Sequence, residues 1–211
     1  MDIVKQYRQC RKVGMQLNSR IIESADKELF GKAAALLNML EDNTIVLEED
    51  YERDVLMDFI INERINGDKS VAETFLQSQS LENDVERDIL NALISSYTSL
   101  FKIESILRDE KVIILNDILN ERNEIKLTDI GFSETASPEM LLFTRIVPFD
   151  NFNMTSGLSF LFPAGREEYL LRRYRRIRRK YKAQDEATAR FAAFFELNRT
   201  EGLLVKYQRV R

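Results

Sequence analysis

The fold is decided by residues 99–117, which read SLFKIESILRDEKVIILND. Upstream of this stretch, apolar residues recur at helical spacing. Within it they form short runs from Leu100 to Leu107 and from Val112 to Leu115, on either side of the turn signal Asp109-Glu110. Short apolar runs bounded by polar turns are typical of strands. The period of the chain therefore changes from helix to strand near Ser99.

Three further strands are predicted downstream, at Ile125–Leu127, at Leu141–Val147 and at Met154–Phe162, which contains Gly157. A turn is expected at 120–123 and a loop through Gly131 to Pro138. Five short strands in roughly 65 residues, without helical crossovers between them, indicate a small antiparallel β-barrel or rolled sheet and not a parallel α/β sheet.

The first 98 residues carry helical patterns. An apolar stripe runs through Tyr7, Cys10 and Val13, so Cys10 is expected to be a buried, unreactive thiol. Ser70 and either Ser80 or Asn83 are candidate helix caps, because their side chains can accept from free backbone N–H groups. The sequence predicts several amphipathic helices in this half.

The last part of the chain is strongly basic. Residues 166–182 read REEYLLRRYRRIRRKYK. Residues 166–211 carry 14 basic and 6 acidic side chains, a balance of +8, so residues 1–165 carry −12 of the total charge of −4. We expect one long helix from Arg166 to near Asn198, with a tail after Gly202 that fits either a strand or a helix. Such a charge split points to an anionic partner or to an internal acid–base contact.

Two surfaces of this helix are candidate binding sites. A narrow apolar seam is predicted to assemble the protein with a partner or with its own core; it comprises Leu170, Tyr174, Ile177 and Tyr181. The basic faces are predicted to bind phosphates through arginine forks, with the tyrosines stacking on bases. The candidate anion- or nucleic-acid-binding residues are Arg172, Arg175, Arg176, Arg179, Lys180 and Lys182. A membrane surface is disfavoured, because the seam is narrow and the chain has no Trp.

These patterns define an α+β protein with three segments: a helical region at 1–98, a small antiparallel β module at 99–164, and a long basic helix with its tail at 165–211. The boundary near residue 98 is a change of period and not a flexible linker, since the sequence there is neither Gly/Ser-rich nor Pro-rich.

The amino-acid composition limits the kinds of catalytic and metal-binding sites that the chain can form. The chain has no histidine and one cysteine, which removes the commonest general base, intrachain disulfides and zinc sites built from Cys and His. No catalytic, metal or cofactor-binding residue is assigned, and no cofactor is expected.

The sequence shows no targeting or membrane-spanning pattern. The N-terminus is too charged for a signal peptide, and no apolar run is long enough to span a bilayer, so a cytoplasmic location is expected.

Two weaker candidates remain. Asp50, Asp54 and Asp58 lie four apart and are expected to share one helix face, either as a hard-cation site or as a solvated acidic surface where the basic helix docks. The segment Asp129–Ser133 is expected to be a tight loop with unusual backbone angles at Gly131. Ser133 has no histidine to activate it, and only a Ser–Lys arrangement with Lys126 or Lys111 is formally open.

Several segments together resemble a known group. They include Asp129-Ile-Gly-Phe-Ser-Glu-Thr-Ala136 and Arg145-Ile-Val-Pro-Phe-Asp-Asn-Phe152. Over roughly residues 30–165 the chain resembles a group of uncharacterised bacterial proteins with a helical front half and a β module behind it. The β segment is also faintly similar to a module that accompanies the SEC-C metal-binding motif. This chain lacks the Cys and His of that motif, so the resemblance implies an architecture and no activity.

The sequence therefore predicts a non-enzymatic, cytoplasmic interaction or assembly protein that uses its helical surfaces and its basic helix. The alternative is RNA binding, or non-specific nucleic-acid binding, through residues 166–182. RNA is favoured over specific DNA because no helix-turn-helix pattern is present.

Overall fold

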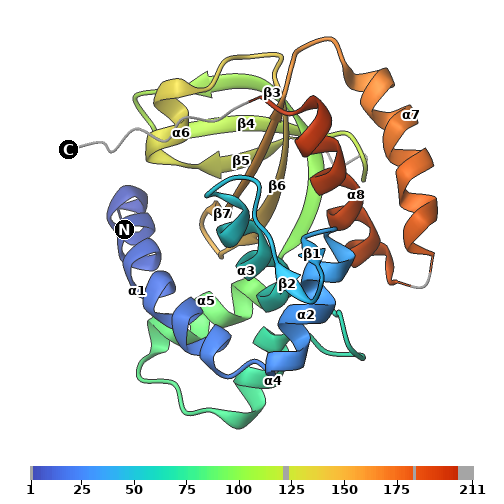
Figure 1. Cartoon of the computed structure of the whole chain (residues 1–211). Helices are drawn as coiled ribbons and strands as arrows, with labels where there is room; N and C mark the ends of the chain where they lie inside the picture. Colours follow the sequence, from blue (N-terminus) through green and yellow to red (C-terminus); the bar gives the residue numbers. More distant parts are fainter. Residues whose placement is uncertain (1, 121–123, 183, 204–211) are drawn as a thin grey trace.

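The computed structural model describes residues 2–120, 124–182 and 184–203. Its N-terminal half is helical, as predicted, apart from a two-residue hairpin (Figure 1). Within the described ranges, no helix is long and apolar enough to span a bilayer. The elements of this half are α1 (Ile3–Glu23), α2 (Lys27–Leu36), β1 (Leu40–Glu41), β2 (Thr44–Ile45), α3 (Glu52–Asn62), α4 (Val71–Ser78) and α5 (Asp84–Ile94).

Short polar side chains begin these helices as the sequence indicates. The Ser70 hydroxyl accepts from the backbone N–H of Glu73, and the Glu73 carboxylate accepts from the backbone N–H of Ser70, which makes a capping box at α4. Asn83 caps α5 by accepting from the backbone N–H of Glu86. Each cap satisfies helix N–H groups that have no partner within the helix.

The β module is a rolled sheet. Its elements are β3 (Tyr97–Leu107), β4 (Val112–Asp117), β5 (Ile125–Thr128), the short helix α6 (Ile130–Thr135), β6 (Leu141–Pro148) and β7 (Asn153–Phe162). The strand order is β3-β4-β5-β7-β6, and β6 pairs back with β3. All these pairs are antiparallel except that of β5 with β7, which meet through the single parallel pair Leu127 and Asn153. The prediction of a small barrel or rolled sheet is confirmed, with this one departure from antiparallel pairing.

The burial of strand β6 on both faces explains why residues 141–147 (LLFTRIV) are so apolar. Its alternate residues face opposite sides of the sheet, and both sides are covered. Leu142 and Ile146 join Phe101 and Ile113 in a cluster inside the roll, whereas Phe143 belongs to the cluster shared with the helices. A strand buried on both faces is a continuous apolar run in sequence.

A bulge interrupts the pairing of β6 with β7. Thr144 pairs with Ser159 and Ile146 pairs with Thr155, so residues 156–158 lie opposite the single residue Arg145. Gly157 has φ +113°, a conformation that L side chains rarely adopt. A glycine inside a predicted strand is a signal of this kind of bulge.

The prediction of one long C-terminal helix is wrong. The segment folds into α7 (Glu167–Arg178), a short 3₁₀ turn η1 (Arg179–Tyr181) and α8 (Glu186–Glu201), which pack against each other. The break falls before Asp185, whose side chain accepts from the backbone N–H groups of Ala187 and Thr188 and so caps α8. An N-cap signal inside an otherwise helical pattern starts a new helix. Figure 1 shows α8 against the sheet and α7 outside it.

The largest core cluster joins all three segments of the chain. Phe194 of α8 stacks on Phe143 of β6, with ring centroids 4.3 Å apart, and on Tyr174 of α7 at 4.8 Å. Phe59 of α3 and Phe191 of α8 meet in the same cluster, with ring centroids 4.9 Å apart.

Two predicted segments are described only in part. The predicted turn at 120–123 lies mostly outside the described residues, and the tail after Gly202 is described only at Leu203, which forms an isolated bridge with Leu161.

Candidate functional site

All six predicted anion-binding residues lie on the exposed face of α7, of η1 and of the turn that follows. They are Arg172, Arg175, Arg176, Arg179, Lys180 and Lys182. Basic residues in the last turn of α7 and the acids Glu167 and Glu168 in its first turn both complement the helix dipole. That accounts for part of the charge. It does not account for the continuation of the charge through η1 to Lys182.

The cations of this face divide into paired and unpaired groups. Lys180 bonds Glu196 of α8 at 2.6 Å, and Arg178 bonds Glu186 of α8. Arg172 lies 3.9 Å from Glu168 on its own helix. By contrast, Arg175, Arg176 and Arg179 make no ion pair with any acid in the described parts of the chain. These three guanidinium groups therefore have free donors facing solvent.

Among the described residues, Glu48 and Glu52 of the front half form ion pairs with α8, and no acid of the front half pairs with the basic face. Arg199 of α8 bonds Glu52 at 2.7 Å and Glu48 at 3.1 Å. Glu52 is fully buried at the start of α3. An internal acid–base contact is one of the two alternatives that the charge split leaves open. It exists, but it is made by Arg199, which lies 20 residues beyond Arg179.

The predicted assembly seam lies inside its own chain. Leu170, Tyr174, Ile177 and Tyr181 are all buried in the core cluster that holds α8 and the sheet. Burial raises the pKa of Tyr181 to about 12, and the nearby Glu196 carboxylate adds to the rise. The seam thus anchors α7, and its burial turns the basic face outward.

The three aspartates predicted to share a face do not act together. Asp50 and Asp54 are exposed, whereas Asp58 is buried beneath them against β6. Arg145 Nε donates to Asp58 Oδ1 at 2.8 Å, and Arg145 Nη2 donates to Glu63 Oε1 at 2.5 Å. A solvated acidic surface is therefore the wrong description of Asp58. Within the described chain, no group of three or more Asp, Glu or Cys residues is placed to hold a metal ion.

Burial raises the pKa of Glu63, because the desolvation of its carboxylate outweighs the attraction of Arg145. The Asp58 carboxylate raises this pKa further. The network of one arginine and two acids has a net negative charge when both acids are ionised. Protonation of Glu63 makes it neutral.

This raised pKa predicts a pH-dependent effect of Glu63→Gln. A carboxyl whose pKa is higher in the folded state stabilises the fold below its unfolded pKa, and that stability is lost as pH rises through the folded pKa. The variant has no such loss, so its free energy of unfolding relative to wild type should rise from pH 4.5 upward. The gain is about 1.4 kcal/mol for each pH unit that separates the folded and unfolded pKa values. Urea unfolding across this pH range measures it. Glu110→Gln, at an exposed turn, should show no trend, and a flat difference for Glu63→Gln would contradict the prediction.

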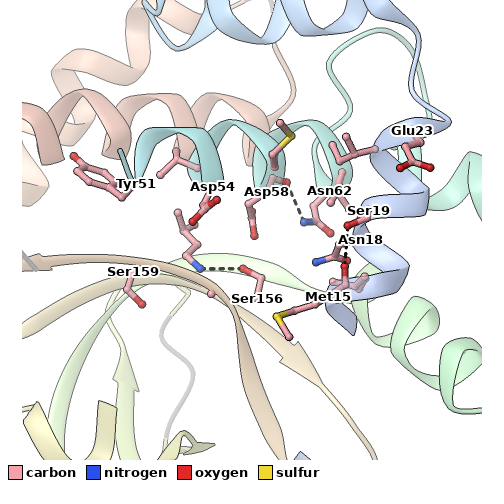
Figure 2. Close-up of a pocket in the computed structure, with 17 residues that line it drawn as sticks. Met15, Asn18, Ser19, Glu23, Tyr51, Asp54, Asp58, Asn62, Ser156 and Ser159 are labelled. Atoms are coloured by element: carbon pink, nitrogen blue, oxygen red, sulfur yellow. Dashed lines mark hydrogen bonds between the residues drawn. The ribbon is translucent and has the colours of Figure 1, made fainter. Parts of the chain in front are cut away.

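A cavity of about 610 Å³ opens between α1, α3 and β7 (Figure 2). Its wall includes Asn18 of α1, Asp54 and Asn62 of α3, Ser156 in the β7 bulge and Ser159 directly after it. Its size is within the range of roughly 300–1,000 Å³ typical of small-molecule sites. The sequence did not predict this cavity. Gly157 within a predicted strand was the one local signal near it.

The Asp129–Ser133 candidate is a structural element. It forms the start of α6, where Asp129 caps the helix by accepting from the backbone N–H of Phe132 at 2.9 Å. Gly131 has ordinary helical angles, so the predicted unusual backbone is wrong. Ser133 is buried and donates to the carbonyl of Ile130. Lys111 bonds Glu134, and Lys126 is largely exposed near Glu124, so neither lysine approaches Ser133 as a base.

Cys10 is buried, as predicted. Burial raises the pKa of its thiol, and Asp88 adds to the rise. A thiol with a raised pKa forms little thiolate at neutral pH and is a poor nucleophile.

Comparisons with known proteins give a family and no activity. No curated protein and no solved structure is significantly similar to the chain. A family of unknown function (DUF7986) matches residues 1–208. This agrees with the resemblance to an uncharacterised family, whereas these comparisons do not support the likeness to the SEC-C module or the bacterial grouping. Because the match covers nearly the whole chain, the protein belongs to this family of unknown function (DUF7986).

Proposed function

We propose that the protein is a non-enzymatic binding protein that holds RNA, or another single-stranded nucleic acid without sequence preference, through phosphate contacts with the outward face of α7 and η1. The observation that carries this proposal is the free state of three neighbouring arginines. Arg175, Arg176 and Arg179 are exposed and make no ion pair in the described residues, while the seam beneath them is buried. A guanidinium group with free donors forms bidentate bonds to phosphate.

The burial of the seam separates this proposal from its alternatives. Self-assembly through Tyr174 and Ile177 has less support, because both side chains already pack in their own core. Membrane binding has less support for the same reason, since α7 keeps no apolar face free to enter a bilayer. Tyr174 and Tyr181 are not available to stack on bases, since both rings are buried. Contacts limited to phosphates imply binding without sequence preference.

The test is a charge reversal on this face. The variant Arg175→Glu/Arg176→Glu/Arg179→Glu should bind a labelled single-stranded RNA at least about tenfold more weakly than wild type. A plot of the logarithm of the variant's association constant against the logarithm of the salt concentration should have a slope shallower than that of wild type by about 2. Each phosphate contact to a single strand contributes about 0.7 to that slope, and the variant loses three such contacts. Fluorescence anisotropy at several salt concentrations measures both quantities.

A matched control is available on α1. Lys5, Arg8 and Lys12 are exposed on one helix face, and their reversal to Glu changes the net charge by the same amount. This control should retain the wild-type affinity within about twofold, since long-range charge effects are screened at physiological salt. Equal weakening by both variants would mean that only net charge matters. Absence of wild-type binding at physiological salt would reject the proposal and turn the search to acidic proteins.

A further inference from the structure

The cavity between α1, α3 and β7 presents unpaired hydrogen-bond acceptors. Asn18 Oδ1 and Asn62 Oδ1 are buried in its wall and have no hydrogen-bond partner. The amide nitrogen of Asn62 donates to the carbonyl of Asp58 at 3.0 Å, which fixes which end of this amide is free. Buried acceptors without a partner are uncommon in folded proteins, and each calls for a donor. Figure 2 shows Asn18 on α1 and Asn62 on α3, both at the wall of the cavity.

The charges in the wall have one sign. The wall contains the carboxylates of Glu23, Asp54 and Asp58 and no lysine or arginine. Asp58 is paired with Arg145 behind it, and Arg145 also pairs with Glu63. The Asp54 side chain is 80% exposed and lies 3.6 Å from Arg53, whose side chain is 69% exposed, and such an exposed ion pair is too weak to occupy the Asp54 carboxylate. The cavity is therefore an acceptor-rich, negatively charged environment.

The remainder of the wall is apolar. Val55 and Ile61 of α3, Leu93 of α5 and Leu158 of the bulge contribute side chains. Sites of this size combine an apolar lining with a few polar groups that set the orientation of the ligand. An apolar ligand body alone would leave the two amide oxygens unpaired. An anionic ligand would be repelled by the carboxylates.

We propose that this cavity binds a small organic cation, namely an ammonium group on an alkyl or aryl body. An ammonium group has three donors and no acceptor, which complements the oxygens of Asn18 and Asn62, and its positive charge is attracted by the carboxylates of the cavity wall, Asp54 among them. The apolar body contacts Val55, Ile61 and Leu158. The site is independent of the proposed RNA surface, which lies on α7 and η1 and carries the opposite charge.

The experiment compares three probes with the same body and different heads: 3-phenylpropylammonium, 3-phenylpropanol and 3-phenylpropanoate. Isothermal titration calorimetry on the 211-residue chain should show saturable binding of the ammonium. The alcohol should bind about tenfold more weakly, because it lacks the charge-assisted bonds, and the carboxylate should not bind measurably. In ¹H–¹⁵N NMR spectra, the ammonium should shift the signals of residues 156–159 and the side-chain amides of Asn18 and Asn62.

Paired variants test the role of the charge. Asp54→Asn should weaken the ammonium about tenfold and leave the alcohol unchanged. Asp84→Asn is the matched control, because Asp84 is also an exposed aspartate beside an arginine, on α5, and it should change nothing. Equal binding of ammonium and alcohol, NMR shifts confined to other surfaces, or no saturation by the ammonium would each overturn the proposal. RNA binding is measured separately, so either proposal can fail without the other.

Discussion

Replacing Arg145 by methionine should lower the free energy of unfolding by about 3–5 kcal/mol, because it leaves two buried carboxylates without their cation. The side chains of Arg145, Asp58 and Glu63 are 3%, 8% and 2% exposed, so solvent cannot replace the lost interaction. Methionine fills much of the volume of the arginine stem, and the loss therefore reports the charges more than a cavity. Urea unfolding at pH 7 measures it.

Two further variants isolate the electrostatic cause. Arg53→Met removes an arginine that is 69% exposed and 3.6 Å from Asp54, and it should change the stability by less than about 0.5 kcal/mol. The triple variant Arg145→Met/Asp58→Asn/Glu63→Gln removes all the buried charges together and should recover most of the loss, since neutral groups cost far less to bury. If the triple variant is as unstable as Arg145→Met alone, packing and not charge is the role of Arg145.

Truncation of Phe194 to alanine should also cost about 3–5 kcal/mol, the range for deleting a buried phenylalanine. Phe194 is fully buried, and its ring packs against Phe143 on the sheet and Tyr174 on α7. Its removal opens a void between the sheet and the helix that carries the basic face. Thermal or urea unfolding measures the loss. RNA binding by the remaining folded protein should weaken as α7 loosens.

Phe149→Ala is the control for this truncation. Phe149 is only partly buried and stacks on Phe152 at a centroid distance of 4.8 Å, so its truncation should cost less than half as much. Equal losses for the two variants would mean that Phe194 has no special role between the sheet and α7.

Local patterns in the sequence predicted most of the secondary structure. The change of apolar spacing near Ser99 marks the start of β3, which begins at Tyr97. The strands β4 to β7 lie where the short apolar runs are. Ser70 and Asn83 begin helices because a short polar side chain beside free N–H groups needs no distant partner. The short helix α6 was missed because its six residues are too few for an apolar period.

The basic segment shows where local patterns mislead. Its apolar seam continues with small interruptions from Leu170 toward Phe195, which favoured one helix, although Asp185 was a cap signal within it. The candidate arginines are exposed on α7 and η1. Their freedom from ion pairs was not predictable, because that depends on which acids fold back near them.

By itself, the sequence determined most of the helices and strands and their order along the chain, since each depends on spacings within about ten residues. Only the tertiary structure decided that Arg145 is buried, because its partners Asp58 and Glu63 lie 87 and 82 positions away. The same holds for the cavity, whose wall brings Asn18, Asn62 and the β7 bulge together. The physical reason is that a charged or polar group buried inside the fold is stable only next to an oppositely charged or hydrogen-bonding group. Because that partner can lie far away in the sequence, only the tertiary structure shows which residue it is.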